Sequence, residues 1–314
     1  MAVVESFLEF PMVEFTKYQG AGNDYLFIDA LAEQRDWPRL AKAMSDRHFG
    51  VGADGIILAA PSKVADAAVR MRIFNADGSE GEMCGNGLRC FAKFVIDRDL
   101  VAGGRESLNV ETGAGVLTVE PLWDAASIVG ARVNMGEPIL RAVGVPTDPS
   151  QAGESDYTAL DVALIENLGL LPSDLMFDAP VQVGNDPIFG TAVSMGNPHF
   201  VSFLDTPVYD IPLDKVGPLV EHHAVFPNRV NWSVVNIKDR GHLVGRTWER
   251  GSGITLACGT GVSAVVVAAR LHGLVDDHVS LDWPGGTLGI TWPGHGQVIM
   301  EGDAVEVFSG AFPA

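Results

Sequence analysis

The 314-residue sequence predicts an α/β (α+β) protein made of two homologous halves, and three observations support this prediction. Short apolar runs bounded by Gly, Pro, Asn or Asp recur along the chain, as β-strands do. Two helical segments each begin directly after a glycine-rich turn that contains a cysteine. Landmark residues also repeat at the same spacing in both halves, which is the signature of an internal duplication. The length itself fits about two domains of ordinary size.

The strands are predicted by their apolar residues, because each run is short and ends at a turn-forming residue. Seven such runs predict strands at residues 25–28, 56–58, 69–74, 116–119, 200–204, 232–237 and 305–308.

Helical periodicity is clearest at residues 88–96 and 262–271. In the first segment Leu88, Phe91 and Val95 share one face. The second, VSAVVVAARL, is apolar nearly all round, so other structure must enclose it on every side, as a curved sheet would. A weaker amphipathic segment, residues 160–171, lies inside the stretch 146–187, which is rich in Pro, Gly and Asp at both ends. We interpret that stretch as connecting structure at the start of a second domain.

The internal repeat is seen in the spacing of the cysteines. The interval from Asn23 to Cys84 is identical to the interval from Asn197 to Cys258. The turns MCGNG and ACGTG surround the two cysteines, and each turn opens a predicted helix. Asn75 also precedes Cys84 by the same interval as Glu249 precedes Cys258. Two homologous halves, each with one cysteine at a helix start, account for all of these matches.

A cysteine at a helix start has a defined chemistry. The unpaired amides and partial positive charge of a helix N-terminus lower the pKa of a thiol and also bind a carboxylate. One thiolate and one thiol on opposite sides of a tetrahedral carbon would remove a proton from one face and return one to the other, which is racemisation or epimerisation. The α-proton of an amino acid is so weakly acidic that the reaction needs an electrophilic cofactor or preorganised donors. No clear pyridoxal-phosphate lysine site is seen, so the route without a cofactor stays open.

Four segments resemble the diaminopimelate epimerase family: GAGNDYLFID, RIFNADGSEGEMCGNGLRC, MGNPHF and ERGSGITLACGTGVSA. This family interconverts LL- and meso-2,6-diaminopimelate in lysine and peptidoglycan precursor synthesis. The resemblance implies two pseudo-symmetric domains, each a mixed sheet or barrel around a central helix, with the active site between them. It also implies no cofactor, no metal and a homodimer. The expected domains are residues 13–134 plus 303–314, carrying Cys84, and residues 135–302, carrying Cys258.

The resemblance also assigns site residues. It implies that Cys84 and Cys258 are the catalytic pair, the first as proton donor and the second as acceptor, with roles exchanged by direction. It implies that His199 and Glu249 tune the thiol pKa values. The residues that it assigns to substrate binding are Asn23, Asn75, Gly85, Asn86, Asn197, Asn231, Glu249, Arg250, Gly259 and Thr260. Two positions depart from the frequent family pattern: Gly55 stands where Gln is common, and Ile254 replaces an acidic residue.

Each of these residues also has an ordinary structural explanation. Without the family resemblance, the four Asn residues at positions 23, 75, 197 and 231 would be read as turn residues that satisfy their own backbone. His199 would be a core or loop histidine, and Glu249 and Arg250 a solvated ion pair. Cys90 lies inside the first predicted helix without a partner turn, so we expect it to be an ordinary buried residue.

Charge excludes several classes of partner. The sequence has 21 basic and 40 acidic residues, and the net charge of −19 disfavours nucleic acid and anionic membrane surfaces. The start, MAVVESFLEFPM, has no basic region typical of an export signal, and no apolar run approaches the roughly 18 residues of a membrane span. These features predict a cytoplasmic protein with a small-molecule substrate, which the family resemblance identifies as diaminopimelate.

Two motifs of other site types are discounted. Residues 50–55 match the dinucleotide pattern GxGxxG, but polar residues precede the motif and a strand-like run follows it, so a tight turn is expected. Three scattered cysteines and eight histidines show no zinc-ligand spacing.

Two alternative functions remain. One is a related racemase or epimerase for another amino acid, of the histidine or proline type. The other is a non-catalytic thiol-switch or ligand-binding protein. Asn86, together with Glu249 and Arg250, favours the diaminopimelate branch. The absence of a CxxC pair weakens the redox interpretation.

Overall fold

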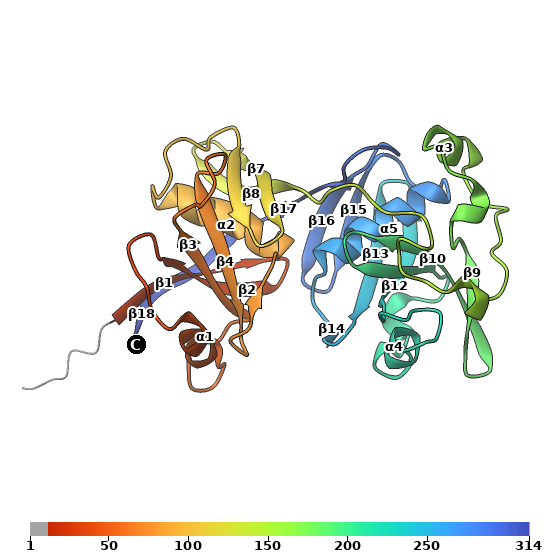
Figure 1. The fold of residues 1–314 in the computed structure, drawn as a ribbon, viewed down its shortest axis with the longest axis horizontal. Coiled ribbons are helices and arrows are strands. Elements are labelled where there is room, and N and C mark those ends of the chain that lie inside the picture. The colour runs from red at the N-terminus through yellow and green to blue at the C-terminus, as the bar shows by residue number, and fades with distance from the viewer. Residues whose placement is uncertain (1–11, 314) are drawn as a thin grey trace, which may run out of the picture. The chain divides into compact units, whose positions relative to one another are not determined.

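The computed structural model describes residues 12–313. Contacts divide these residues into two compact units, and Figure 1 draws both. Unit 1 comprises residues 12–20, 24–131 and 304–313, and unit 2 comprises residues 21–23 and 132–303. The expectation about an export signal falls almost entirely on residues 1–11, which lie outside the described part.

Unit 1 is a mixed sheet with two helices. Its elements are β1 (Met12–Gly20), β2 (Asn23–Asp29), α1 (Trp37–Ser45), β3 (Gly55–Ala60), β4 (Val69–Asn75), β5 (Glu80–Gly81), α2 (Gly85–Asp97), β6 (Leu108–Thr112), β7 (Gly115–Asp124), β8 (Ser127–Asn134), which runs into unit 2, and β18 (Val305–Pro313). Strand β2 pairs in parallel with β3, β3 pairs antiparallel with β4, and β4 pairs in parallel with β6. The last strand, β18, pairs antiparallel with the first, β1.

Unit 2 repeats this plan with an added segment at its start. Its elements are η1 (Pro149–Gln151), α3 (Val162–Asn167), η2 (Pro172–Asp174), β9 (Ala179–Val183), β10 (Asp186–Ser194), β11 (Pro198–Phe203), η3 (Val208–Asp210), α4 (Leu213–Glu221), β12 (Asn231–Asp239), β13 (His242–Glu249), β14 (Gly253–Ile254), α5 (Gly259–Leu271), β15 (His278–Trp283), β16 (Gly286–Thr291) and β17 (Ile299–Asp303). Strand β11 pairs in parallel with β12, β12 pairs antiparallel with β13, and β13 pairs in parallel with β15.

The predicted duplication is therefore present in the topology. The series β1-β2-α1-β3-β4-β5-α2-β6-β7-β8 corresponds element by element to β10-β11-α4-β12-β13-β14-α5-β15-β16-β17. Parallel and antiparallel pairings fall at the same places in both series, as at β2–β3 and β11–β12. The α/β fold class with mixed sheets is confirmed.

The second cysteine helix is enclosed, as its composition requires. Every residue of α5 from Gly261 to Ala269 is buried, and Leu271 is also buried. Figure 1 shows α5 among the strands of unit 2. The corresponding helix of unit 1, α2, buries the predicted face of Leu88, Phe91 and Val95 and also buries Cys90, which is 1 % exposed. Cys90 is thus a core residue, as expected.

The stretch 146–187 was predicted incompletely. The interpretation as connecting structure missed β9, which forms an antiparallel hairpin with β10. The amphipathic segment 160–171 is helical only over Val162–Asn167. Asp161 caps this helix and Gly169, at φ +67°, follows it, so local turn chemistry limits the helix more than the apolar pattern does. The other predicted strands and both cysteine helices lie where expected, except that Leu204 lies just beyond β11.

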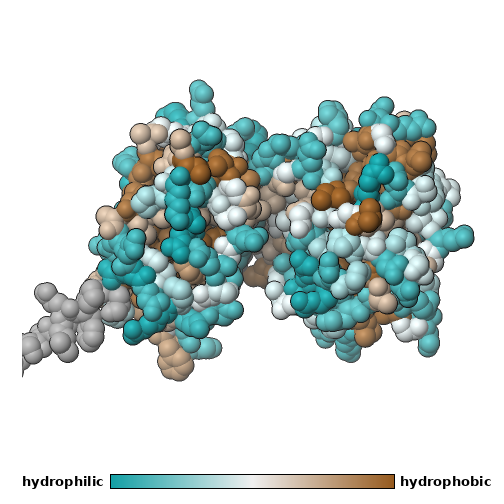
Figure 2. Space-filling model, viewed as in Figure 1, coloured by the Kyte–Doolittle hydropathy of each residue, from teal (hydrophilic) through white to brown (hydrophobic). Residues whose placement is uncertain are grey.

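The visible surface of both units is mainly hydrophilic, with scattered apolar residues (Figure 2). Within residues 12–313, none of the helices has the length and apolar character needed to cross a membrane. The GxGxxG motif forms a turn that leads into β3, as expected, and not a strand–turn–helix unit.

Candidate active site

Both repeat cysteines are the N-cap residues of the central helices. Cys84 caps α2 and Cys258 caps α5, each with an extended backbone. Each Cys carbonyl accepts the first helical hydrogen bond, from Leu88 N at 2.8 Å and from Val262 N at 2.9 Å. This placement brings each sulfur beside unpaired helix-start amides, where negative charge is stabilised. The sequence interpretation of the two turns as helix starts is confirmed.

A glycine follows each cysteine by three residues, where a side chain would crowd Ile57 in one half and the cysteine sulfur in the other. At Gly87 an added Cβ would lie 3.6 Å from the Cys84 sulfur and 2.7 Å from Ile57 Cδ1. At Gly261 it would lie 3.0 Å from the Cys258 sulfur. The Gly87 amide donates to the Cys84 sulfur at 3.4 Å. Any side chain at either position would displace the sulfur or its surroundings.

Cys84 is surrounded by groups that favour its thiolate. Burial raises the pKa of the Cys84 thiol above its ordinary value, and the Gly87 amide, a hydrogen bond from the Tyr25 side chain, the charge of Arg89 and the Asn86 amide reduce that rise without reversing it. Asn86 is 3 % exposed, and its Oδ1 accepts from Arg89 Nη1 at 2.9 Å. The cysteine, the helix-start amides and a buried guanidinium therefore form one cluster in unit 1.

Three neighbouring strands align Tyr25, Gly55 and Asn75. Tyr25 on β2 faces Gly55 on β3, which faces Asn75 on β4. An added Cβ at Gly55 would lie 3.1 Å from the Tyr25 ring and 2.2 Å from the Phe74 carbonyl oxygen. Because Gly55 stands where Gln is common in the family, the Tyr25 ring lies against backbone atoms at this position. Asn75 donates to Ser79 Oγ at 3.0 Å.

Cys258 has an acidic neighbour. Burial raises the pKa of the Cys258 thiol well above its ordinary value, and the charge of Glu249 and a hydrogen bond to it add to this rise. Hydrogen bonds from Thr260 and the Gly261 amide oppose it. Burial also raises the pKa of Glu249, whose carboxylate accepts a short hydrogen bond from Thr255 Oγ1. The expected proximity of Glu249 to a cysteine is therefore seen within unit 2.

A chain of hydrogen bonds joins His199 to Cys258. Because Asn197 Oδ1 can only accept, His199 Nε2 donates to it, at 3.0 Å. Asn197 Nδ2 donates to Thr260 Oγ1 at 3.2 Å, and Thr260 Oγ1 lies 3.6 Å from the Cys258 sulfur. Burial, with the charge of Arg250, lowers the pKa of His199 to about 3, so the ring is neutral at ordinary pH.

Two buried polar atoms of this site have no hydrogen-bond partner among the described residues. They are His199 Nδ1, an acceptor, and Asn231 Nδ2, a donor. Such orphaned groups are costly in a protein interior unless a ligand or water satisfies them. An unsatisfied donor and an unsatisfied acceptor in the half-site of Cys258 are what a site for a polar ligand would have.

Arg250 lies in a turn that several buried groups hold. Its amide donates to Asn231 Oδ1 at 2.9 Å, and its Nη1 donates to the Asn228 carbonyl at 2.9 Å. No ion pair between the described residues involves Arg250, so none of their carboxylates neutralises its charge. Its position fits a guanidinium that binds a ligand carboxylate.

Glu221 anchors this turn, and sequence reasoning did not find it. Its side chain is 4 % exposed and accepts from Trp248 Nε1 at 2.7 Å and from the Gly251 amide at 2.9 Å. Helix α4 lies so close to Trp248 that a Cβ at Gly217 would be 2.4 Å from the indole ring. Glu221 is distant in the sequence from the turn that it holds, and no local motif connects the two.

The remaining expected positions have simple surroundings. Asn23 begins β2 and is half-buried, and Gly85 and Gly259 are the first residues of α2 and α5. Ile254 is 43 % exposed in the short strand β14, so this departure alters a surface position.

Sequence reasoning also missed Tyr25 and Arg89. The repeat spacing could have identified Tyr25, because Tyr25 follows Asn23 by the same interval as His199 follows Asn197. Arg89 had no such signal, since it stands in a helical pattern as an ordinary polar position.

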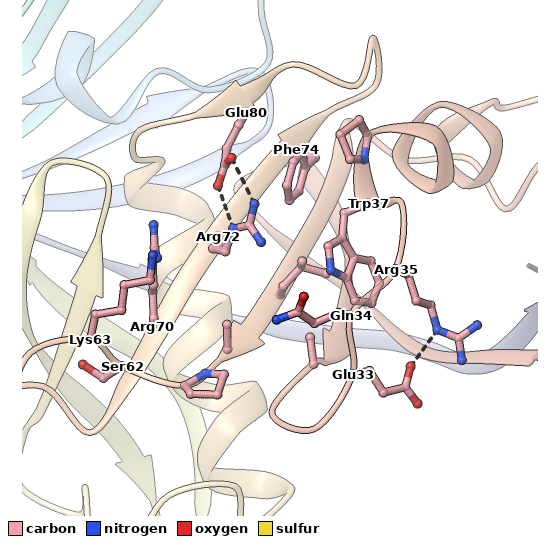
Figure 3. Close-up of a pocket in the computed structure, with 15 residues that line it drawn as sticks. Glu33, Gln34, Arg35, Trp37, Ser62, Lys63, Arg70, Arg72, Phe74 and Glu80 are labelled. Carbon is pink, nitrogen blue, oxygen red and sulfur yellow. Dashed lines mark hydrogen bonds and ion pairs between the residues drawn. The ribbon is translucent and has the colours of Figure 1, made fainter.

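The cavity in Figure 3 lies elsewhere in unit 1 and holds none of the predicted site residues. It has a volume of about 690 Å³ beside α1 and β4. Its arginines are largely neutralised, because Arg72 pairs with Glu80 at 2.7 Å and Arg35 pairs with Glu33 at 2.7 Å. Across residues 12–313, no cluster of three or more His, Cys, Asp or Glu side chains is arranged to hold a metal ion.

Comparison with known proteins identifies the family. The family described as diaminopimelate epimerase matches residues 15–140 and 191–307. The diaminopimelate epimerase of Desulfovibrio desulfuricans is 43 % identical over 303 residues, which cover 96 % of this chain and 98 % of the relative. That of Moorella thermoacetica is 42 % identical over 304 residues, covering 96 % and 99 %.

Solved structures show the same fold at low identity. A phenazine biosynthesis protein of the PhzF family from Bacillus anthracis has a TM-score of 0.61 at 18 % identity, covering 96 % of this chain and 99 % of that chain. A hydroxyproline epimerase from Agrobacterium vitis has a TM-score of 0.59 at 12 % identity, covering 96 % and 91 %. The family match over both halves and the full-length relatives show that the chain belongs to the diaminopimelate epimerase family.

Proposed function

We propose that this chain interconverts LL- and meso-2,6-diaminopimelate without a cofactor, through proton transfer between a cysteine of each half and the substrate α-carbon. The observation that carries the proposal is that each half of a duplicated fold presents one cysteine as the N-cap of its central helix. The family relationship supports the substrate and the isomerase chemistry. The product serves lysine and peptidoglycan precursor synthesis.

The two thiols exchange protons with opposite faces of one carbon. One sulfur, as thiolate, takes the α-proton, while the other, as thiol, donates its proton to the opposite face, so the configuration inverts. The helix-start amides of Gly85, Asn86, Gly259 and Thr260 bind the reacting carboxylate and stabilise the negative charge that develops on it. This stabilisation supplies what an electrophilic cofactor would otherwise supply.

The non-reacting end of the substrate is held by polar groups around Cys258 and β2. Arg250 binds the distal carboxylate, and Asn231 donates its orphaned amide to the substrate. Asn23, Asn75 and Asn197 complete the binding set, with Glu249 as a partner for an ammonium group. The net charge of −19 is compatible with a substrate whose two carboxylates are balanced by two ammonium groups.

His199 and Glu249 set the proton distribution of the pair. Neutral His199 orients Asn197 and thus Thr260, whose hydroxyl donates to the Cys258 sulfur. Glu249, half-buried beside Cys258, favours the protonated thiol. Both residues therefore act on the cysteine rather than on substrate alone.

The proposal extends to the assembly and location. We assign the two half-sites to domains formed by residues 13–134 with 303–314 and by residues 135–302. The enzyme acts as a cytoplasmic homodimer on a small molecule, with no nucleic acid or membrane partner. Strand β18 exposes Val305, Val307 and Phe308 at 41 %, 51 % and 44 %, which gives an apolar surface for a second copy.

Incubation with LL-diaminopimelate in deuterated water tests the function. The expected result is meso product that carries one α-deuterium, measured by chiral chromatography and mass spectrometry. L-proline and L-histidine are assayed in parallel, because turnover of either instead of diaminopimelate would assign the chain to a related racemase. Absence of both exchange and inversion with all three amino acids would exclude an epimerase of these types.

A further inference from the structure

The two half-sites share a backbone but differ in charge at equivalent positions. Alignment of Cys84 with Cys258 pairs Tyr25 with His199, Asn75 with Glu249 and Arg89 with Ser263. Each pair places different chemistry around an equivalent sulfur. The differences indicate which sulfur is better suited to hold a negative charge.

The sulfur of Cys84 has a cation and several donors around it. Arg89 on α2 is fully buried, and its guanidinium donates to the side chain of Asn86, the second residue of the same helix. A buried guanidinium keeps its charge at any working pH and attracts a nearby anion strongly, because little water screens it. The Tyr25 hydroxyl adds a hydrogen bond to the sulfur, and the Gly87 and Asn86 amides complete the set of donors.

The position of Tyr25 is well defined by the sheet. The residue is 7 % exposed, and its ring lies against Gly55, where any Cβ would be 3.1 Å from Cε1. The missing side chain at Gly55 therefore accommodates the phenol ring that reaches Cys84. A hydroxyl held in this way donates to a thiolate more favourably than to a neutral thiol.

The sulfur of Cys258 has the opposite surroundings. Ser263, which occupies the position equivalent to Arg89, is neutral and donates to the Gly259 carbonyl at 2.9 Å. Glu249 lies next to the sulfur and is hydrogen-bonded to it. The donors on this side are the Thr260 hydroxyl and the Gly261 amide, and the strongest effect of a charge on the Cys258 thiol comes from Glu249. A negative charge on this sulfur would face a carboxylate.

We propose that Cys84 is the cysteine of the pair that ionises first in the resting enzyme, and that the Tyr25 hydroxyl and the Arg89 guanidinium are the groups that hold its charge. Cys258 then carries the proton. This inference rests on the proposed function only in treating the two sulfurs as an acid–base pair.

One turnover exchanges the protonation states of the two sulfurs. Starting from the resting state, the Cys84 thiolate forms an S–H bond with the α-proton, and Cys258 donates its own proton to the opposite face. The enzyme is left with Cys84 as thiol and Cys258 as thiolate. Exchange with solvent returns one proton to Cys258 and removes one from Cys84, which restores the resting state without a net change of charge.

Alkylation by iodoacetamide across a pH series, without substrate, tests the assignment. Peptide mass spectrometry reports the rate at each cysteine, and the midpoint of each pH profile measures ionisation independently of accessibility. We expect the Cys84 midpoint to lie below that of Cys258, with Cys90 unreactive as an internal control for folding. A Cys258 midpoint equal to or below that of Cys84 would overturn the proposal.

The variant Tyr25→Phe tests whether the Tyr25 hydroxyl stabilises the Cys84 thiolate. It keeps the ring against Gly55 and removes the hydroxyl, so Cys84 should react about tenfold more slowly near neutral pH, as a midpoint rise of about one pH unit gives. The Cys258 profile should not move. Tyr18→Phe is the matched control, because Tyr18 is also buried in unit 1 but donates to Glu306 at 3.0 Å.

Two results would refute the role of Tyr25: an unchanged Cys84 midpoint in Tyr25→Phe, or the same shift in Tyr18→Phe. A parallel variant, Arg89→Lys, keeps the positive charge and should shift the Cys84 midpoint less than Arg89→Met; equal shifts would refute the role of the charge. Because no substrate is present, these outcomes are independent of whether the chain epimerises diaminopimelate.

Discussion

The two cysteine half-sites share a frame and differ in what surrounds the sulfur. In each, the cysteine caps a buried helix, a glycine follows three residues later, and parallel and antiparallel strands pair in the same order. Around that frame, Cys84 has a cation and a phenol, whereas Cys258 has a carboxylate and a chain of neutral amides and hydroxyls. The repeated fold thus provides equivalent geometry, and the residues that differ between the halves make the two sulfurs chemically unequal.

The two half-sites also differ in how the equivalent residues Tyr25 and His199 are connected to the cysteine sulfurs. Tyr25 acts on Cys84 directly, while its repeat equivalent, His199, reaches Cys258 only through Asn197 and Thr260. A direct donor changes the energy of a thiolate more than a relayed one does. The comparison therefore predicts that substitutions in the two halves will have different consequences, even at equivalent positions.

Removal of either sulfur should have the largest effect. Cys84→Ala and Cys258→Ala each leave one face of the substrate carbon without an acid or base, so we expect kcat to fall by at least about a thousandfold. Diaminopimelate inversion measured by chiral chromatography checks this. Cys90→Ala is the matched control and should keep most of the activity. Substantial inversion by either single variant would show that one base is enough.

Glu249→Gln should make the two half-sites more alike. The variant removes the carboxylate beside Cys258 while keeping a side chain that accepts from Thr255, so the Cys258 thiol should ionise at lower pH. We expect roughly a tenfold to hundredfold loss of kcat, since Cys258 no longer retains its proton as firmly. The pH profile of kcat and the alkylation profile of Cys258 should shift together. A fall in kcat without either shift would assign Glu249 to substrate binding alone.

Changes at Glu221 should have a smaller effect, through the turn that carries Arg250. Glu221→Gln weakens the acceptor for Trp248 Nε1 and for the Gly251 amide, and a buried hydrogen bond lost in this way costs about 1–3 kcal/mol. We expect KM for diaminopimelate to rise roughly tenfold with kcat little changed, because the turn would hold Arg250 less well.

Trp248→Phe is the partner variant for this prediction. It removes the indole N–H that donates to Glu221 and should reproduce part of the rise in KM. Equal losses of kcat and thermal stability, with KM unchanged, would make Glu221 a purely structural residue.

Acidification should destabilise unit 2 more than unit 1, and this is the smallest of the predicted effects. Burial lowers the pKa of His199 to about 3 and that of His272 to about 4, and both residues lie in unit 2. The unfolded chain takes up protons on these residues that the folded unit does not, so unit 2 loses stability as pH falls from about 6.5 toward 4. Well above about pH 6.5 both rings are neutral in either state, and their contribution does not change.

Hydrogen exchange over this pH range checks the prediction. Amides of α5 should lose protection as the pH falls, while those of α2 change less, because the single histidine in the described part of unit 1, His48, is exposed. His272→Gln should reduce the dependence, since it removes one of the two buried rings. Equal loss of protection in α2 and α5 would contradict the predicted difference in acid sensitivity between the two units.

The sequence was informative where the chemistry is local. The N-cap cysteines, the enclosed helix around Val265 and the repeated interval before each cysteine follow from neighbouring residues or from simple spacing, so they could be predicted. Glu221 could not, because it meets the Arg250 turn only through the packing of α4 on Trp248. Arg89 could not either, since a periodic helix pattern does not reveal that a charged residue is fully buried.

Strand β9 was missed for a different physical reason. Pro180 lies within it and Gly184 follows it directly, and both residue types are typical of loops. Its pairing with β10 depends on a partner strand that itself has a proline as its second residue, so neither strand start is visible in the local pattern.

The pairing of β18 with β1 has a consequence for how the chain is made. Thr16 lies opposite Ser309, so the first strand of unit 1 gains this partner only after the intervening unit 2 has been synthesised. Unit 2 is synthesised in full before that, and domains commonly fold as they emerge. We therefore expect unit 2 to fold during translation before the sheet of unit 1 is completed, because that completion requires closure of a long loop. A protein truncated before β18 would retain one folded cysteine helix and leave the other without its finished sheet.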